Sequence, residues 1–144
     1  MIPGNRRRLI LTYLQSLLYA QKDQFRLFLE VLDKQKNAIK QGAAETITAY
    51  IEREEQILAG ILAFQKSAES WEALCRNDAQ SAGEILEIKT ALEALRQEAS
   101  FRSKENQRLL AQRMAATASE LQALKTSPLR KRNSVYTGHI DITI

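Results

Sequence analysis

The feature that most constrains this chain is an apolar stripe that repeats with the period of an α-helix between residues 11 and 39. Alternating steps of three and four residues give the positions Leu11, Leu14, Leu18, Gln21, Phe25, Phe28, Leu32, Gln35 and Ile39. This spacing is typical of a helix that packs lengthwise against another helix. The two glutamines on the stripe are interpreted as hydrogen-bonded register markers or as residues at its edge.

A second stripe with the same rhythm follows Gly42 and includes Ile47, Tyr50, Ile57, Ile61 and Phe64. Glycine accepts the left-handed conformation that commonly ends a helix, and Lys40 before it suits the negative end of a helix dipole. We therefore expect a first helix from near Asn5 to about Gln41 and a second from about Ala44 to about Cys75. A connection this short predicts an antiparallel helical hairpin.

Charge and burial are both expected to hold this hairpin together. Residues 5–41 carry eight Lys/Arg and three Asp/Glu, whereas residues 43–72 carry two and six. Opposite charges favour pairing of the two helices, although exposed ion pairs contribute only about 0 to 1 kcal/mol each. Burial of the stripes must supply most of the stability. Glu52, Glu54 and Glu55 form an acidic patch, interpreted mainly as a solvated face and alternatively as a partner site.

A third helix is predicted to start at a capping box formed by Ser81 and Glu84 and to reach about Lys125. Its apolar residues fall into two groups on either side of the polar stretch 96–108. The first group is Ile85, Ile88, Leu92 and Leu95, and the second is Leu109, Leu110, Met114, Leu121 and Leu124. The two groups differ in heptad phase, so the face rotates or the helix kinks between them.

These two groups predict a division of labour along the third helix. The first should complete a three-helix core around Phe25, Phe28, Ile57 and Ile61. The second should overrun the hairpin and leave Leu110, Met114, Leu121 and Leu124 partly uncovered. An uncovered apolar strip usually marks a partner site, although these residues could equally be ordinary core.

The sequence thus predicts an all-α fold, an elongated antiparallel hairpin plus a long third helix, in a bundle domain of residues 1–125. Residues 126–144 are expected to form a flexible basic and apolar tail. Ser127 and Pro128 end the helix, and a basic run of residues 130–132 follows. The apolar tail residues available to a partner are Val135, Tyr136, Ile140, Ile142 and Ile144.

Composition argues against an enzyme and against a membrane-spanning protein. The 144 residues are 44% apolar and 26% charged, and no apolar run reaches the roughly 18 to 20 residues that span a bilayer. The start, with Arg6 to Arg8, imitates a signal peptide, but polar residues interrupt its apolar segment, so a cytoplasmic, uncleaved chain is expected. Cys75 and His139 are single, and Cys75 is interpreted as a small buried hydrophobe. We expect no catalytic residues, metal, cofactor or small-molecule ligand.

In the order of these features the chain resembles the FlgN-type flagellar export chaperones of bacteria. The resemblance lies in the long first helix, the segment GAAETITAYIEREEQIL after it, and ENQRLLAQRM in the third helix. It also includes a tail after a Ser-Pro boundary with Tyr136 and the segment Ile140-Asp141-Ile142. These features occur in the order found in that family.

The resemblance implies a cytoplasmic protein that binds partners without chemistry. Members of the family hold unassembled hook–filament junction proteins, FlgK and FlgL, and deliver them to the flagellar type III export gate. Their C-terminal part binds the substrate, which here implies partner-binding residues Leu109, Leu110, Met114, Leu121, Leu124, Tyr136, Ile140 and Ile142. A homodimer is left open, and neither nucleic acid nor a small molecule is an expected partner.

Two alternatives come from other functional classes. A nucleic-acid binder is suggested by a pI near 9.3 and by the basic runs 6–8 and 130–132, since binding to phosphates requires such charges. No aromatic or Asn-rich surface accompanies these runs, and the second helix is acidic. The other alternative is a structural coiled coil or a membrane-surface protein whose basic first helix lies on anionic lipid.

Overall fold

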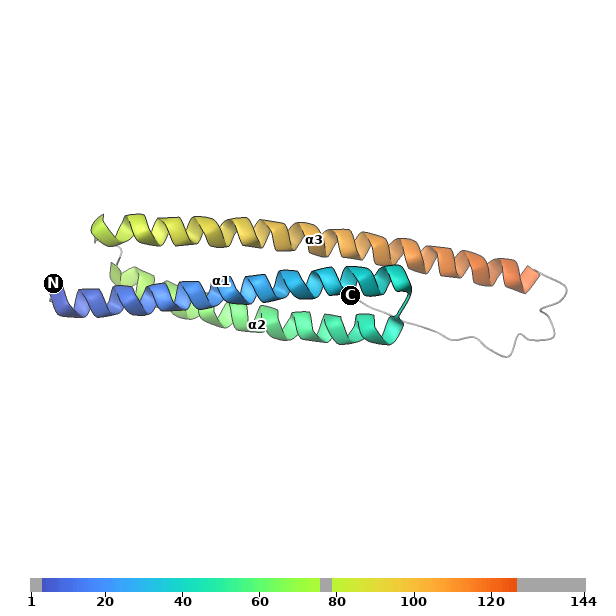
Figure 1. The fold of residues 1–144 in the computed structure, drawn as a ribbon, viewed down its shortest axis with the longest axis horizontal. Helices are drawn as coiled ribbons and strands as arrows, with labels where there is room; N and C mark the ends of the chain where they lie inside the picture. Colours follow the sequence, from blue (N-terminus) through green and yellow to red (C-terminus); the bar gives the residue numbers. More distant parts are fainter. Residues whose placement is uncertain (1–3, 76–78, 127–144) are drawn as a thin grey trace.

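The fold is an elongated bundle of three long helices (Figure 1). The computed structural model describes residues 4–75 and 79–126. Helix α1 spans Gly4–Gln41, α2 spans Ala44–Cys75 and α3 spans Ala79–Thr126. The predicted all-α class, the hairpin and the three helices are confirmed. The tail residues 127–144, with Tyr136, Ile140 and Ile142, lie outside the described residues.

The turn between α1 and α2 closes in the way that its glycine predicts. Gly42 has a φ of +71°, in the left-handed region. Its amide donates to the carbonyl of Ile39 at 3.1 Å, and the amide of Ala43 donates to the carbonyl of Ala38 at 3.1 Å. These two bonds form a Schellman motif, which satisfies carbonyls that the end of α1 would otherwise leave unpaired.

Helix α1 is the shared partner of the other two helices. It packs along both α2 and α3, whereas α2 and α3 make little contact with each other. Leu17, Val31 and Ala38 are buried and, together with Gln24, repeat every seven residues along one side of α1. Gln24 lies against Gly60 of α2, so this side of α1 faces α2. The row that contains Leu32 and Gln35 contacts α3 instead, through Asn106. α1 therefore needs a wider apolar face than a helix that packs against a single partner helix.

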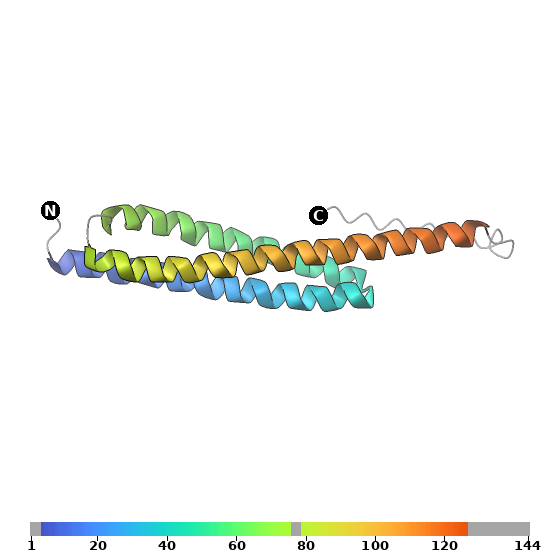
Figure 2. The same cartoon turned by 90° about the horizontal axis from the view of Figure 1, so that it is seen from above.

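Helix α3 runs parallel to α1 with a nearly constant register. Gln15 donates to Glu84, Arg102 to Asp33 and Asn106 to Gln35, so bonded partners are 69 to 71 positions apart. At this offset the end of α1 at residue 41 lies beside residues 110–112 of α3. α3 continues to Thr126 and extends past the turn of the hairpin (Figure 2). The predicted overrun is confirmed.

The main core combines the residues that the stripes predicted. Its buried members from α1 and α2 include Phe25, Leu32, Ile57 and Ile61, and Phe28 packs partly buried against them. From α3, Ile88 and Leu92 are buried, and Leu95 packs at the edge. The expected assignment of this first half of α3 to the core is confirmed.

One local expectation, the start of α3, is wrong. The capping box would start α3 at Ser81, but the helix begins at Ala79, so Ser81 lies inside it. The carboxylate of Glu84 accepts a hydrogen bond from Gln15 of α1 at 2.8 Å and thus serves the packing of α3 on α1. The ion pairs Asp33–Arg102 and Glu72–Lys89 join α3 to α1 and to α2.

Replacing Gly42 with alanine should destabilise the bundle by about 1 to 2 kcal/mol, because an L-residue is strained in the left-handed conformation. An added Cβ would also lie 2.7 Å from the tip of the Arg113 side chain, which can move away. Gly60→Ala is the matched control. Its Cβ would meet only Gln24, at 3.6 Å, so it should stabilise α2 by about 0.5 to 1 kcal/mol. Urea unfolding measures the stability of both variants. Equal changes of the same sign in the free energy of unfolding would contradict this explanation of the turn.

Candidate partner-binding site at the end of the bundle

A small apolar cluster closes the end of the bundle where α1 turns into α2. Its buried members are Ala38, Ile39, Ile47 and Leu110, and Leu109, Tyr50 and Ile51 pack partly buried against them. Only 5% of Leu110 is exposed. The expectation that Leu110 is partly uncovered is therefore wrong, and this residue anchors α3 to the hairpin.

Leu110 is buried because the contact face of α3 continues through its polar middle. From Ile85 the face proceeds by steps of three and four through Leu92, Ala99, Arg102 and Asn106 to the cluster at Leu110. Ala99 and Asn106 are buried, and Nη1 of Arg102 lies 3.0 Å from both carboxylate oxygens of Asp33. α3 is one unbroken helix across this stretch. Polar residues thus occupy positions on the contact face of α3, where the sequence predicts that the face rotates or the helix kinks.

A polar layer of three residues separates the two apolar clusters. Nδ2 of Asn106 donates to Oε1 of Gln35 at 2.9 Å and to the carbonyl of Leu32 at 2.8 Å. Nε2 of Gln35 donates to Oε2 of Glu54 at 3.4 Å, so the layer joins all three helices. The interpretation of Gln35 as a hydrogen-bonded register marker is confirmed. Gln21 is also buried.

The projecting segment, residues 114–126 of α3, lies beyond the small cluster. It is about 20 Å long at 1.5 Å per residue. Met114 is 42% exposed and Leu121 is 45% exposed, while Leu124 is partly buried. These three residues follow Leu110 by steps of four, seven and three, so they share one face of the helix. Of the expected strip, Met114 and Leu121 are uncovered, and Leu109 and Leu110 belong to the bundle.

An open hollow of about 300 Å³ lies at the base of the projecting segment. It is lined by Ile39 and Lys40 of α1 and by Leu109, Gln112, Arg113 and Ala116 of α3. The hollow joins the end of the hairpin to the first turn of the projecting segment. A bound helix could rest on both surfaces.

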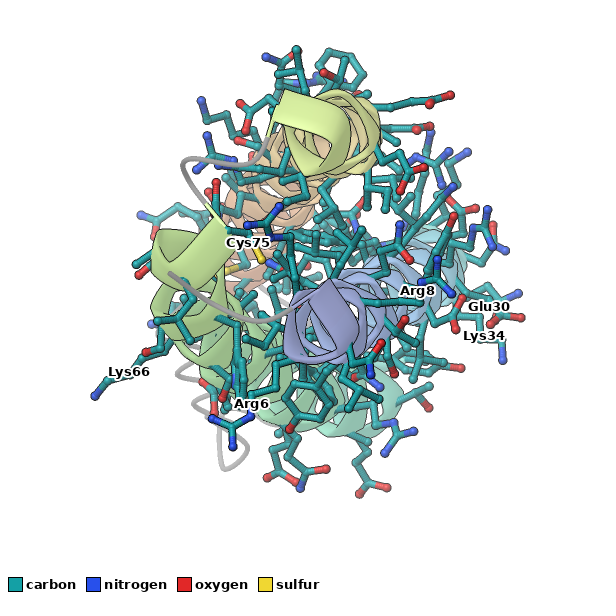
Figure 3. The ribbon with its side chains drawn as sticks, turned by 90° about the vertical axis from the view of Figure 1, so that its left-hand side faces the viewer. Arg6, Arg8, Glu30, Lys34, Lys66 and Cys75 are labelled. Carbon is teal, nitrogen blue, oxygen red and sulfur yellow. The ribbon has the colours of Figure 1, made fainter. Side chains whose placement is uncertain are left out.

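The remaining candidates do not form a second site in the described part of the chain. Arg6 and Arg8 point outward on different sides of α1, and Cys75 lies between the helices (Figure 3). Cys75 is buried, as expected of a small hydrophobe. Glu52 and Glu55 are exposed, but Glu54 is not, so the acidic patch is only partly a solvated face.

Across residues 4–75 and 79–126, no group of three or more His, Cys, Asp or Glu side chains could hold a metal ion. No described helix combines the length and hydropathy needed to cross a bilayer.

The chain is similar in sequence to a bacterial protein. An uncharacterized protein of Treponema pallidum (strain Nichols) is 30% identical over 105 residues, which cover 73% of this chain and 68% of the relative. This chain belongs to the family of that protein. No protein-family model matches it, and no solved structure matches it.

The contrast between Leu110 and its neighbours on the same face can be tested by truncation to alanine. Leu110→Ala should destabilise the fold by about 2 to 5 kcal/mol, because it empties a buried site. Met114→Ala and Leu121→Ala should each change stability by less than about 0.5 kcal/mol, because their side chains are largely in solvent. Chemical denaturation followed by circular dichroism compares the three. If Met114→Ala destabilised the fold as much as Leu110→Ala, the assignment of the projecting segment would be wrong.

Proposed function

We propose that this protein is a cytoplasmic export chaperone of the FlgN type. It holds an apolar helix at the end of an unassembled hook–filament junction protein, related to FlgK or FlgL, and delivers it to the flagellar type III export gate. The sequence features that resemble this family support the proposal, together with the elongated three-helix architecture. The protein acts by covering an apolar surface, and no chemical step is involved.

The observation that carries the proposal is the position of Met114 and Leu121. Both are exposed, seven residues apart, on a part of α3 that extends past the end of the hairpin. Solvent-exposed apolar residues in a row on one helix face are the counterpart that an amphipathic partner helix requires. Methionine suits this role because its flexible thioether adapts to different surfaces.

The partner helix lies along the strip and against the hollow at its base. Leu109 contributes partly exposed apolar surface there, and Leu124 extends the strip toward the end of α3. Leu110 supports the strip from within the bundle. Tyr136, Ile140 and Ile142, outside the described residues, are proposed to add contacts from the tail.

The double variant Met114→Ser/Leu121→Ser should weaken binding of the purified C-terminal helix of a FlgK-like or FlgL-like protein by more than tenfold, about 1.4 kcal/mol. Its melting temperature should stay close to that of the wild type, because both side chains are largely exposed. Leu86→Ser is the matched control: Leu86 is on α3 and is 66% exposed, but it lies near the opposite end of the bundle. The control should bind like the wild type. Isothermal titration calorimetry measures the affinities.

Two results would contradict the proposal. In one, the wild-type chain fails to bind FlgK-like and FlgL-like helices at micromolar concentrations. In the other, Leu86→Ser weakens binding as much as the double variant does. Tight binding to nucleic acid that falls with salt and with replacement of Arg6, Arg7 and Arg8 would favour the phosphate-binding alternative.

A further inference from the structure

The carboxyl group of Glu54 lies at the point where the three helices meet. Its Oε2 accepts the hydrogen bond from Gln35, which is long at 3.4 Å. Its Oε1 is shielded from solvent and has no hydrogen-bond partner among the described residues. Buried polar atoms are nearly always paired, and an unpaired one lowers stability unless the group becomes neutral or acquires water.

A cavity of about 20 Å³ adjoins this carboxyl group. It is bounded by Gln35 and Ile39 of α1, by Glu54 of α2, and by residues of α3 that include Asn106 and Leu110. Its volume is close to the minimum that holds one water molecule. The cavity can hold one water molecule but not the several that hydrate an ionised carboxylate. Full hydration of the Glu54 carboxylate therefore requires the cavity to expand, which would separate α3 from the hairpin.

No positive charge balances the Glu54 carboxylate within this cavity. All the side chains that line it from α1 and α3 are uncharged, including Ser103 and Gln107. Lys36 of α1 and Arg108 of α3 interact with Glu105. Glu55, on the same helix as Glu54, adds like-charge repulsion.

The electrostatics favour the neutral carboxyl group. Burial raises the pKa of Glu54 to about 7, the hydrogen bond from Gln35 opposes this rise, and the charge of Glu55 adds to it. A raised carboxyl pKa means that the folded protein binds more protons than the unfolded chain between pH 4.5 and about 7. Stability from this group is therefore present at low pH and is lost as the pH rises toward 7.

We propose that Glu54 is a proton-operated latch on helix α3. With the carboxyl group neutral, the three-helix junction stays closed, and α3 is held against the hairpin through Leu110. With the carboxylate ionised, water enters the cavity, and α3 loosens over residues 103–110, immediately before the projecting segment. The latch is built from the described junction alone and does not depend on the identity of the partner.

The test uses the full chain and two glutamine variants. Glu54→Gln keeps the shape of the side chain and removes its titration, and Glu52→Gln does the same at an exposed position of α2. Carboxyl ¹³C NMR of the wild type should give a titration midpoint for Glu54 near 7, well above the ordinary glutamate value of 4.5. Between about pH 5.5 and pH 8, the melting temperatures of wild type and Glu52→Gln should fall relative to that of Glu54→Gln.

Amide hydrogen exchange locates the loosening. After correction for the intrinsic rate, exchange of residues 103–110 should be several-fold faster in the wild type than in Glu54→Gln at the higher pH, and equal at the lower pH. A Glu54 titration midpoint near 4.5 would overturn the proposal. So would unchanged pH dependence of stability or exchange in Glu54→Gln. If that variant fails to fold, the wild-type titration and the pH dependence of exchange in wild type and Glu52→Gln still decide.

Discussion

The structure depends on the burial of α1 between the other two helices. α2 and α3 each pack along α1 and make little contact with each other, so neither could bury its apolar residues if α1 were absent. The nine positions of the α1 stripe are all buried or partly buried, and Leu17, Leu29, Val31 and Ala38 widen the buried face. This geometry produces a long rod in place of a closed, compact bundle.

A rod built on one shared helix needs a device that fixes register, because apolar seams with a heptad repeat can pack in several registers. The polar layer of Gln35, Glu54 and Asn106 provides it, together with the Asp33–Arg102 pair. A slip of one heptad would separate these partners and would change the length of the projecting segment by about 10 Å. The polar residues therefore determine how much of α3 is exposed beyond the hairpin.

Much of this arrangement could be predicted from the sequence, because burial and turn chemistry leave local patterns. The α1 stripe and Gly42 specify the hairpin, and Ile88 and Leu92 specify the core face of the third helix. The burial of Leu110 was not predicted, because Arg102 and Asn106 hide the continuity of the seam. Following the steps of three and four through polar residues would have revealed it. Glu54 lies among exposed glutamates in the sequence, and only the packing of α3 shows that it is partly buried.

Residues up to 113 complete the bundle, and the proposed binding surface is the segment after them together with the hollow at its base. The most direct test compares two truncated chains, one ending after Arg113 and one after Thr126. The account predicts that both melt within about 5 °C of the full chain, since a shift of that size corresponds to about 1 kcal/mol. It also predicts that only the chain ending after Thr126 keeps measurable affinity for a FlgK-like or FlgL-like helix. Loss of folding in the shorter chain, or undiminished binding by it, would contradict the account.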